Sequence, residues 1–135
     1  MFLWALISGY LISEYSKIKT NENIEFFSDE LLFFMVVFAA PIIETLLFQF
    51  FPYYLLNEKL KFYNKWILIL TSGVLFGITH GNDIIIWMFS SVAGFMLMAW
   101  FIHFKKFSTY SNTFFLVCLI HSLSNLYVYI VKAID

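Results

Sequence analysis

Arginine is absent from this sequence, and charge of either sign is scarce. Only 13% of the 135 residues are charged, whereas about a quarter is usual in a soluble domain. Without arginine, the chain lacks the side chain that binds a phosphate through two parallel hydrogen bonds. Its net charge is −1, so it has no basic footprint, and we expect no nucleic-acid partner.

Cysteine is nearly absent too. The single Cys118 lies in an apolar run and has no partner for an intrachain disulfide, so we expect a small core residue there. No internal repeat, low-complexity tract or Gly/Ser linker divides the chain. We therefore predict one membrane-embedded domain over residues 1–135, with its core at about 31–131.

Apolar residues are abundant instead. Hydrophobic residues make up 61% of the chain and 18 residues are Phe, more than a soluble fold of this size has interior to bury. The sequence predicts an all-α, polytopic transmembrane helix bundle with about four full spans plus a short N-terminal apolar helix. A span needs roughly 20 residues, so the first stretch is too short to cross fully. The apolar stretches are 2–12, 31–56, 66–80, 84–104 and about 113–131.

Proline and small residues predict local features of these helices. Pro41 removes one backbone hydrogen bond, which should free the Val37 carbonyl and kink the helix. Small residues recur at a spacing of four, in the pairs Gly73/Gly77 and Ser90/Gly94, and this spacing favours close helix contacts. The contact can lie within one chain or between copies, so the oligomeric state stays open.

Lysines predict the orientation. Loops 57–65 and 105–112 should share one side of the membrane and together carry five of the eight lysines. Because cytoplasmic loops are enriched in positive charge, we expect both loops in the cytoplasm.

Five polar residues stand inside apolar stretches. A charge at the bilayer centre costs roughly 2.5–3.5 kcal/mol on insertion scales, so such residues usually face the interior of a bundle. Counted at about 1.5 Å per residue from the lysine-rich side, the ionisable ones lie at depths of roughly 12–21 Å. Three different helices thus deliver polar groups to one layer. The five residues are Glu44, Gln49, His80, His121 and Asn125.

These residue types suit several chemistries. A carboxylate such as Glu44, in a low-dielectric interior, can act as a general base on water, while imidazole and amide groups can stabilise an oxyanion. This combination fits amide hydrolysis. Two histidines and one carboxylate can instead hold a catalytic Zn²⁺, and a proton or cation pathway uses similar residues.

The order of three short motifs resembles a known family. Glu44 begins E-x₄-Q in PIIETLLFQ, Phe76–His80 reads FGITH, and His121–Asn125 reads HSLSN. Together they are similar to the CAAX-protease and bacteriocin-processing (CPBP) intramembrane peptidases, which are related to the type II CAAX prenyl endopeptidases. That family's pattern is EExxxR, FxxxH and HxxxN/D on separate helices.

The resemblance implies roles for the matching residues. Glu44 would activate the water with help from His80, and His121 and Asn125 would stabilise the oxyanion. Phe76, one helical turn before His80, would brace the imidazole. Cofactors are not required by this reading, although Zn²⁺ bound by Glu44, His80 and His121 remains the alternative.

Two positions depart from the family pattern. Thr45 stands in place of the second glutamate and Gln49 in place of the arginine. Both replacements are neutral, so neither leaves an orphan charge, and we expect a Thr45–Gln49 hydrogen bond in place of an ion pair.

The leading hypothesis is therefore a glutamate-type intramembrane endopeptidase, which would act on a peptide or membrane-protein substrate among membrane lipids. The bacterial plasma membrane is the expected location. One alternative is a non-catalytic membrane partner on the same fold, such as a bacteriocin-immunity or scaffold protein. Another is a component of a proton- or metal-coupled transporter.

Overall fold

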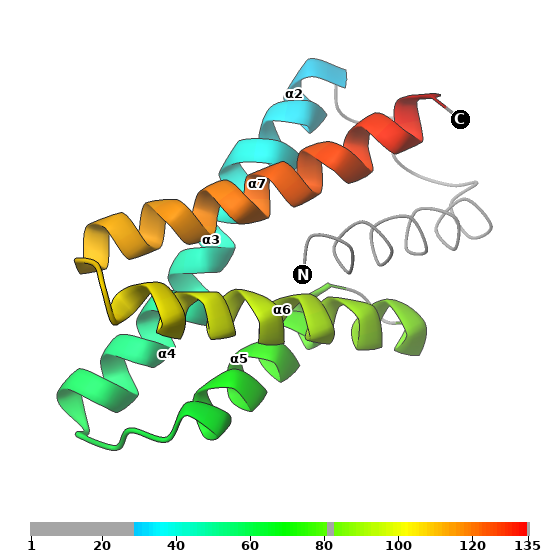
Figure 1. Cartoon of the computed structure of the whole chain (residues 1–135). Coiled ribbons are helices and arrows are strands. Elements are labelled where there is room, and N and C mark those ends of the chain that lie inside the picture. Colours follow the sequence, from blue (N-terminus) through cyan, green and yellow to red (C-terminus); the bar gives the residue numbers. More distant parts are fainter. Residues whose placement is uncertain (1–28, 81–82, 135) are drawn as a thin grey trace.

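The structure, a computed structural model, describes residues 29–80 and 83–134. The predicted short helix 2–12, most of the acidic segment after it, and the Gly81-Asn82 turn lie outside these residues. Within the described ranges every regular element is a helix and there is no strand (Figure 1). The predicted all-α class is confirmed.

The first described helix runs without a break from residue 29 to 59, and we call it helix 29–59. It alternates α-helical segments with wider π-helical turns, in which each N–H bonds the carbonyl five residues back. Over Glu30–Lys59 it is long and apolar enough to cross a membrane. Its segments are α2 (Asp29–Phe34), η1 (Met35–Ala39), α3 (Ala40–Thr45), η2 (Leu46–Phe50), α4 (Phe51–Tyr53) and η3 (Tyr54–Lys59).

Pro41 lies just after the first of these π turns. The Ala40 N–H bonds the Met35 carbonyl, five residues back, so the next donor in the same register would be residue 41. Proline has no N–H, and the carbonyl that loses its partner is therefore Val36. The sequence predicted a freed carbonyl at Val37 from the four-residue spacing of an α-helix, whereas the π turn identifies Val36 by the five-residue spacing.

Three further helices complete the described fold. They are α5 (Lys65–Thr79), α6 (Ile84–Lys105) and α7 (Tyr110–Ile134). The side chains of Asn64 and Asp83 cap α5 and α6 by accepting backbone N–H bonds in the first turn. Helix 29–59, α6 and α7 are long enough to span a membrane, whereas α5 has 15 residues and is shorter. Three long helices and one shorter helix thus replace the four full spans expected.

Small residues bring α5 and α6 together, as the sequence predicted. A Cβ on Gly94 would lie 2.9 Å from the Gly73 Cα and 2.6 Å from the Phe76 Cβ. A Cβ on Gly77 would lie 2.7 Å from the Trp87 carbonyl oxygen. Backbones this close leave no room for a methyl group. The glycine face of α5 is therefore used within the chain.

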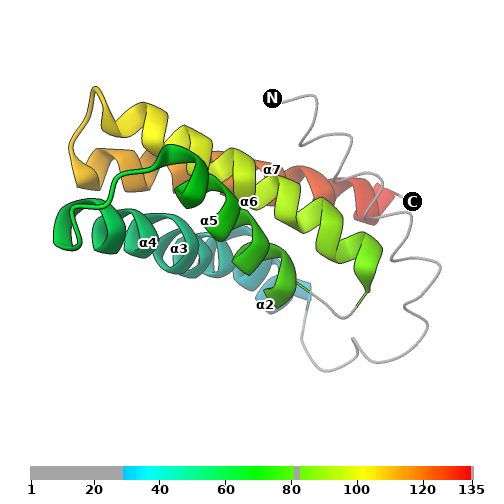
Figure 2. The ribbon, with the colours of Figure 1, turned by 90° about the horizontal axis from the view of Figure 1, so that it is seen from below.

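The two lysine-rich loops lie at the same end of the bundle (Figure 1). There the Tyr110 hydroxyl, at the start of α7, donates a 2.6 Å hydrogen bond to Glu58 at the end of η3. Figure 2 shows α5 running beside α6, in front of α3 and α4. The shared side of the loops is as predicted, and their cytoplasmic placement stays a prediction.

The buried core lies between α5, α6, α7 and the second half of helix 29–59, and includes Leu68, Met98, Phe101 and Val117. Many other large apolar side chains point outward and are exposed in the isolated chain. Such an apolar exterior is expected where lipid, not water, surrounds the bundle.

Candidate active site

Glu44 lies in α3, between two exposed apolar residues and a buried threonine. Ile42 and Ile43 are about half exposed, while Thr45 is fully buried and the Glu44 side chain is 21% exposed. The helix therefore directs its apolar face outward and the Glu44 carboxylate toward the other helices.

His80 ends α5 and faces one oxygen of that carboxylate. Its Nε2 lies 3.6 Å from Glu44 Oε1, and its Nδ1 lies 2.6 Å from the Phe76 carbonyl oxygen. Because a carbonyl oxygen only accepts, Nδ1 carries the proton, and the neutral imidazole presents a lone pair from Nε2 to Glu44. The Phe76 ring stacks on the imidazole with 4.1 Å between centroids. The contact between Phe76 and His80 expected from their spacing is present.

His121, on α7, faces the other carboxylate oxygen. Its Nε2 lies 3.3 Å from Glu44 Oε2, and its side chain is only 6% exposed. Glu44 Oε2 has no hydrogen-bond partner, and neither has His121 Nδ1. Three helices thus place a carboxylate between two imidazoles, and the shared polar layer expected from the sequence is present.

Asn125 lies one turn beyond His121 and contacts a different group. Its Nδ2 donates a 2.9 Å hydrogen bond to the Val36 carbonyl, the one left without a backbone donor by Pro41. The π register of helix 29–59 explains this contact, which the sequence did not predict. One amide hydrogen and the amide oxygen remain for other partners, so oxyanion stabilisation by Asn125 stays a prediction.

The expected Thr45–Gln49 hydrogen bond is not formed. Gln49 Nε2 donates instead to Ser72 Oγ on α5, at 3.4 Å, and the Thr45 hydroxyl has no partner. All three side chains are fully buried. Ser72 was missed from the sequence, although its spacing from Phe76 and His80 by four and eight residues already placed it on their face of α5.

The metal alternative gains no support from the arrangement of donors. Among residues 29–80 and 83–134, no group of three or more His, Cys, Asp or Glu side chains is placed to hold a metal ion. The lone pair of His80 and the oxygens of Glu44 are potential ligands.

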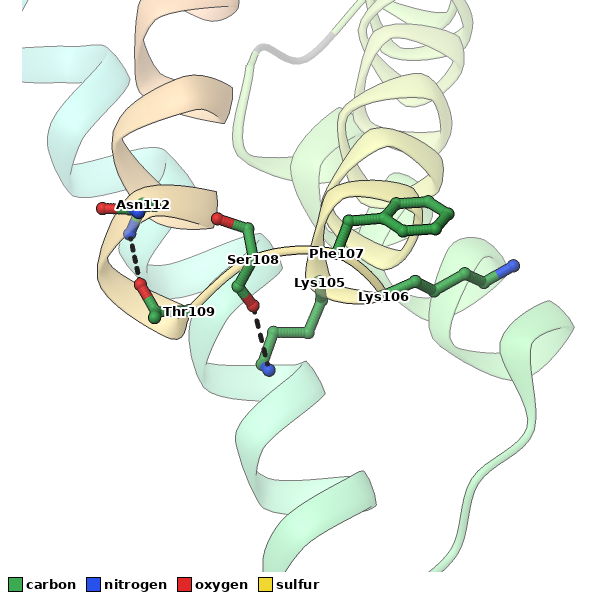
Figure 3. A pocket seen from close by; sticks show the side chains of 6 residues that line it. All are labelled: Lys105, Lys106, Phe107, Ser108, Thr109 and Asn112. Carbon is green, nitrogen blue, oxygen red and sulfur yellow. Dashed lines mark hydrogen bonds between the residues drawn. The ribbon is translucent and has the colours of Figure 1, made fainter.

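Other candidate features lie away from Glu44. An open pocket at the α6–α7 turn is lined by polar and basic side chains and by Phe107, and there Lys105 Nζ donates to the Ser108 carbonyl (Figure 3). His103 is exposed and packs against aromatic rings near the same end of α6. Cys118 is buried and free, with Sγ 3.8 Å from the Pro41 carbonyl oxygen, which agrees with the small core residue expected.

The described residues form an apolar helical bundle with a Glu/His/His cluster between its helices, which is typical of membrane-embedded proteins with a functional polar site. Comparison with protein families narrows the class. Residues 27–127 match the family described as type II CAAX prenyl endopeptidase Rce1-like. The chain belongs to this family, which confirms the resemblance based on the three motifs. Comparisons with curated proteins and with solved structures found no match.

Family membership supports an integral membrane protein and a protease of the CAAX type. It favours the enzyme over a non-catalytic partner, and nothing supports a role in bacteriocin immunity.

Proposed function

We propose that this protein is an intramembrane endopeptidase in which Glu44 and His80 activate a water molecule. The observation that carries the proposal is the pair of imidazoles 3.3 and 3.6 Å from the two oxygens of one membrane-embedded carboxylate.

The separation of Glu44 Oε1 and His80 Nε2 suits one bridging water. The two atoms are 3.6 Å apart, so a water at about 2.8 Å from each can hydrogen-bond both. With Nδ1 of His80 held by the Phe76 carbonyl, both atoms offer lone pairs to the protons of that water. This arrangement favours deprotonation as the water oxygen attacks a carbonyl carbon.

The reaction would proceed in two steps. Glu44 accepts a proton from the water while the water oxygen bonds to the peptide carbonyl carbon, which gives a tetrahedral oxyanion. The same proton then passes to the amide nitrogen, the C–N bond breaks, and a carboxylic acid and an amine are released. Because the base is regenerated, no co-reactant besides water is needed.

His121 and Asn125 are the proposed donors to the oxyanion. The Nε2 of His121 makes no hydrogen bond to Glu44 Oε2, so an N–H at this nitrogen is available to a substrate oxygen. Asn125 retains one amide hydrogen beyond its bond to Val36. Loss of one such donor typically lowers kcat by about 10²–10³.

The proposed substrate is a peptide or membrane-protein segment that reaches this layer from the lipid. The exposed apolar side chains beside Glu44, on Ile42 and Ile43, agree with access from a lipid-facing side. The bacterial plasma membrane, with the lysine-rich loops in the cytoplasm, is the proposed location.

A cleavage assay in vesicles tests the proposal. The purified protein would be reconstituted with a panel of lipid-tethered peptides, prenylated and unprenylated, and products identified by mass spectrometry. Glu44→Gln should abolish cleavage and His121→Ala should lower kcat by about 10²–10³, whereas Glu30→Gln, which removes an exposed carboxylate from the same helix, should leave cleavage unchanged. Equal turnover in Glu44→Gln and the unmodified protein would end the proposal.

A further inference from the structure

Three contacts join α5 to helix 29–59 along one line. His80 faces Glu44 at 3.6 Å, the Phe76 ring meets the Phe48 ring edge-on at 5.6 Å between centroids, and Ser72 accepts from Gln49. On α5 the three residues are spaced by four, so they form one stripe. Later residues of α5 contact earlier residues of helix 29–59, so the two helices run antiparallel.

The three contacts differ in how strictly they fix this register. Ring contacts tolerate sliding, because dispersion attraction has little directionality. A hydrogen bond does not tolerate it, since a shift of one helical turn is about 5.4 Å and would part donor from acceptor. Gln49 and Ser72 are both fully buried, so a shift would strand their polar groups in apolar surroundings.

The pair also connects the two helices that supply the proposed base and its partner. Gln49 follows Glu44 by five residues on one helix, and Ser72 precedes His80 by two turns on the other. In the family pattern the charged residues at positions 45 and 49 lie on one helix, four apart. Here Gln49 reaches across to α5.

We propose that Gln49 and Ser72 are a positioning pair that sets the register of α5 against helix 29–59, and with it the Glu44–His80 distance. This inference rests on the proposed function for its catalytic consequence. Buried polar pairs that fix helix register are the best-attested use of such groups.

A double-mutant cycle tests the pair. Ser72→Ala and Gln49→Met keep similar volume and remove the hydrogen bond, and Thr71→Ala changes an exposed neighbour on α5 as the matched control. Since a misplacement of about 1 Å can cost 10²-fold in rate, each single variant should lower kcat about ten- to hundredfold. KM should stay within about twofold, and the double variant should be no slower than the slower single variant.

A readout without turnover separates this inference from the proposed function. In ¹⁵N spectra of the histidine rings, Glu44→Gln should shift the His80 Nε2 resonance in the unmodified and Thr71→Ala backgrounds. In the Ser72→Ala background that shift should shrink by at least half. If no peptide is cleaved at all, this spectrum still decides whether the pair sets the Glu44–His80 contact.

Either of two results would overturn the inference. One is a full Glu44-dependent shift of His80 in Ser72→Ala protein whose helix content matches the unmodified chain. The other is a pair of single variants whose effects on kcat multiply in the double variant, since independent sites behave in that way.

Discussion

The hydrogen bond from Asn125 to the Val36 carbonyl predicts that the effects of mutating Asn125 and Pro41 on stability are coupled. Asn125 Nδ2 supplies the donor that the Val36 carbonyl lacks because residue 41 is a proline. Asn125→Ala should therefore leave this carbonyl unpaired. In Pro41→Ala the backbone regains an N–H, which gives Val36 a partner in either an α or a π register.

The magnitude follows from the burial of the two groups. An orphaned buried acceptor costs about 1–3 kcal/mol, and hydrogen bonds between membrane helices have measured values of about 0.6–1.7 kcal/mol. Both Asn125 and Val36 are half-buried, so we expect Asn125→Ala to lower the free energy of unfolding by about 1–1.5 kcal/mol. In the Pro41→Ala background the same change should cost about 0.5 kcal/mol or less, which gives a coupling of about 1 kcal/mol.

Reversible unfolding in mixed micelles, followed by circular dichroism, measures these differences. Ser124→Ala is the matched control, because the Ser124 hydroxyl donates to the Ile120 carbonyl of its own helix. This substitution should lower the free energy of unfolding equally with and without Pro41. If Asn125→Ala is as costly in the Pro41→Ala background as in the original chain, the explanation by the π turn is refuted.

Three further predictions concern packing, the loop end and the metal. Gly94→Ala should destabilise the protein by about 1–3 kcal/mol in the same unfolding assay, since the new methyl group would meet Phe76 and Gly73; a change below about 0.5 kcal/mol would contradict the close contact. Tyr110→Phe should cost about 0.5–1.5 kcal/mol through its bond to Glu58, and this loss should vanish in the Glu58→Ala background, which has no side-chain acceptor. Prolonged dialysis against a chelator should leave peptide cleavage within about twofold, whereas loss of cleavage and its return with Zn²⁺ would show that the enzyme needs the metal.

The sequence predicted the helices and the polar layer because both depend on local patterns. Hydropathy over about 20 residues identifies a membrane helix, and the cost of burying Glu44, His80 and His121 in lipid predicts that they face one another. The Phe76–His80 contact followed from a spacing of four on one helix.

What the sequence did not predict depends on register and on partners from other helices. The π turn before Pro41 leaves the Val36 carbonyl without a backbone donor, and no composition rule anticipates that turn. Gln49 bonds Ser72 on α5 and leaves Thr45 without a partner, because the choice between an intrahelical and an interhelical bond is made by packing. A spacing of four shows that two side chains can meet, but not that they do.

Whether Glu44 and His80 share one water can be measured in a high-resolution crystal structure. We expect a solvent peak about 2.8 Å from both Glu44 Oε1 and His80 Nε2, without anomalous signal at the zinc edge. A dry contact between the two side chains, or a peak with zinc anomalous signal at about 2.0–2.1 Å from them, would contradict it.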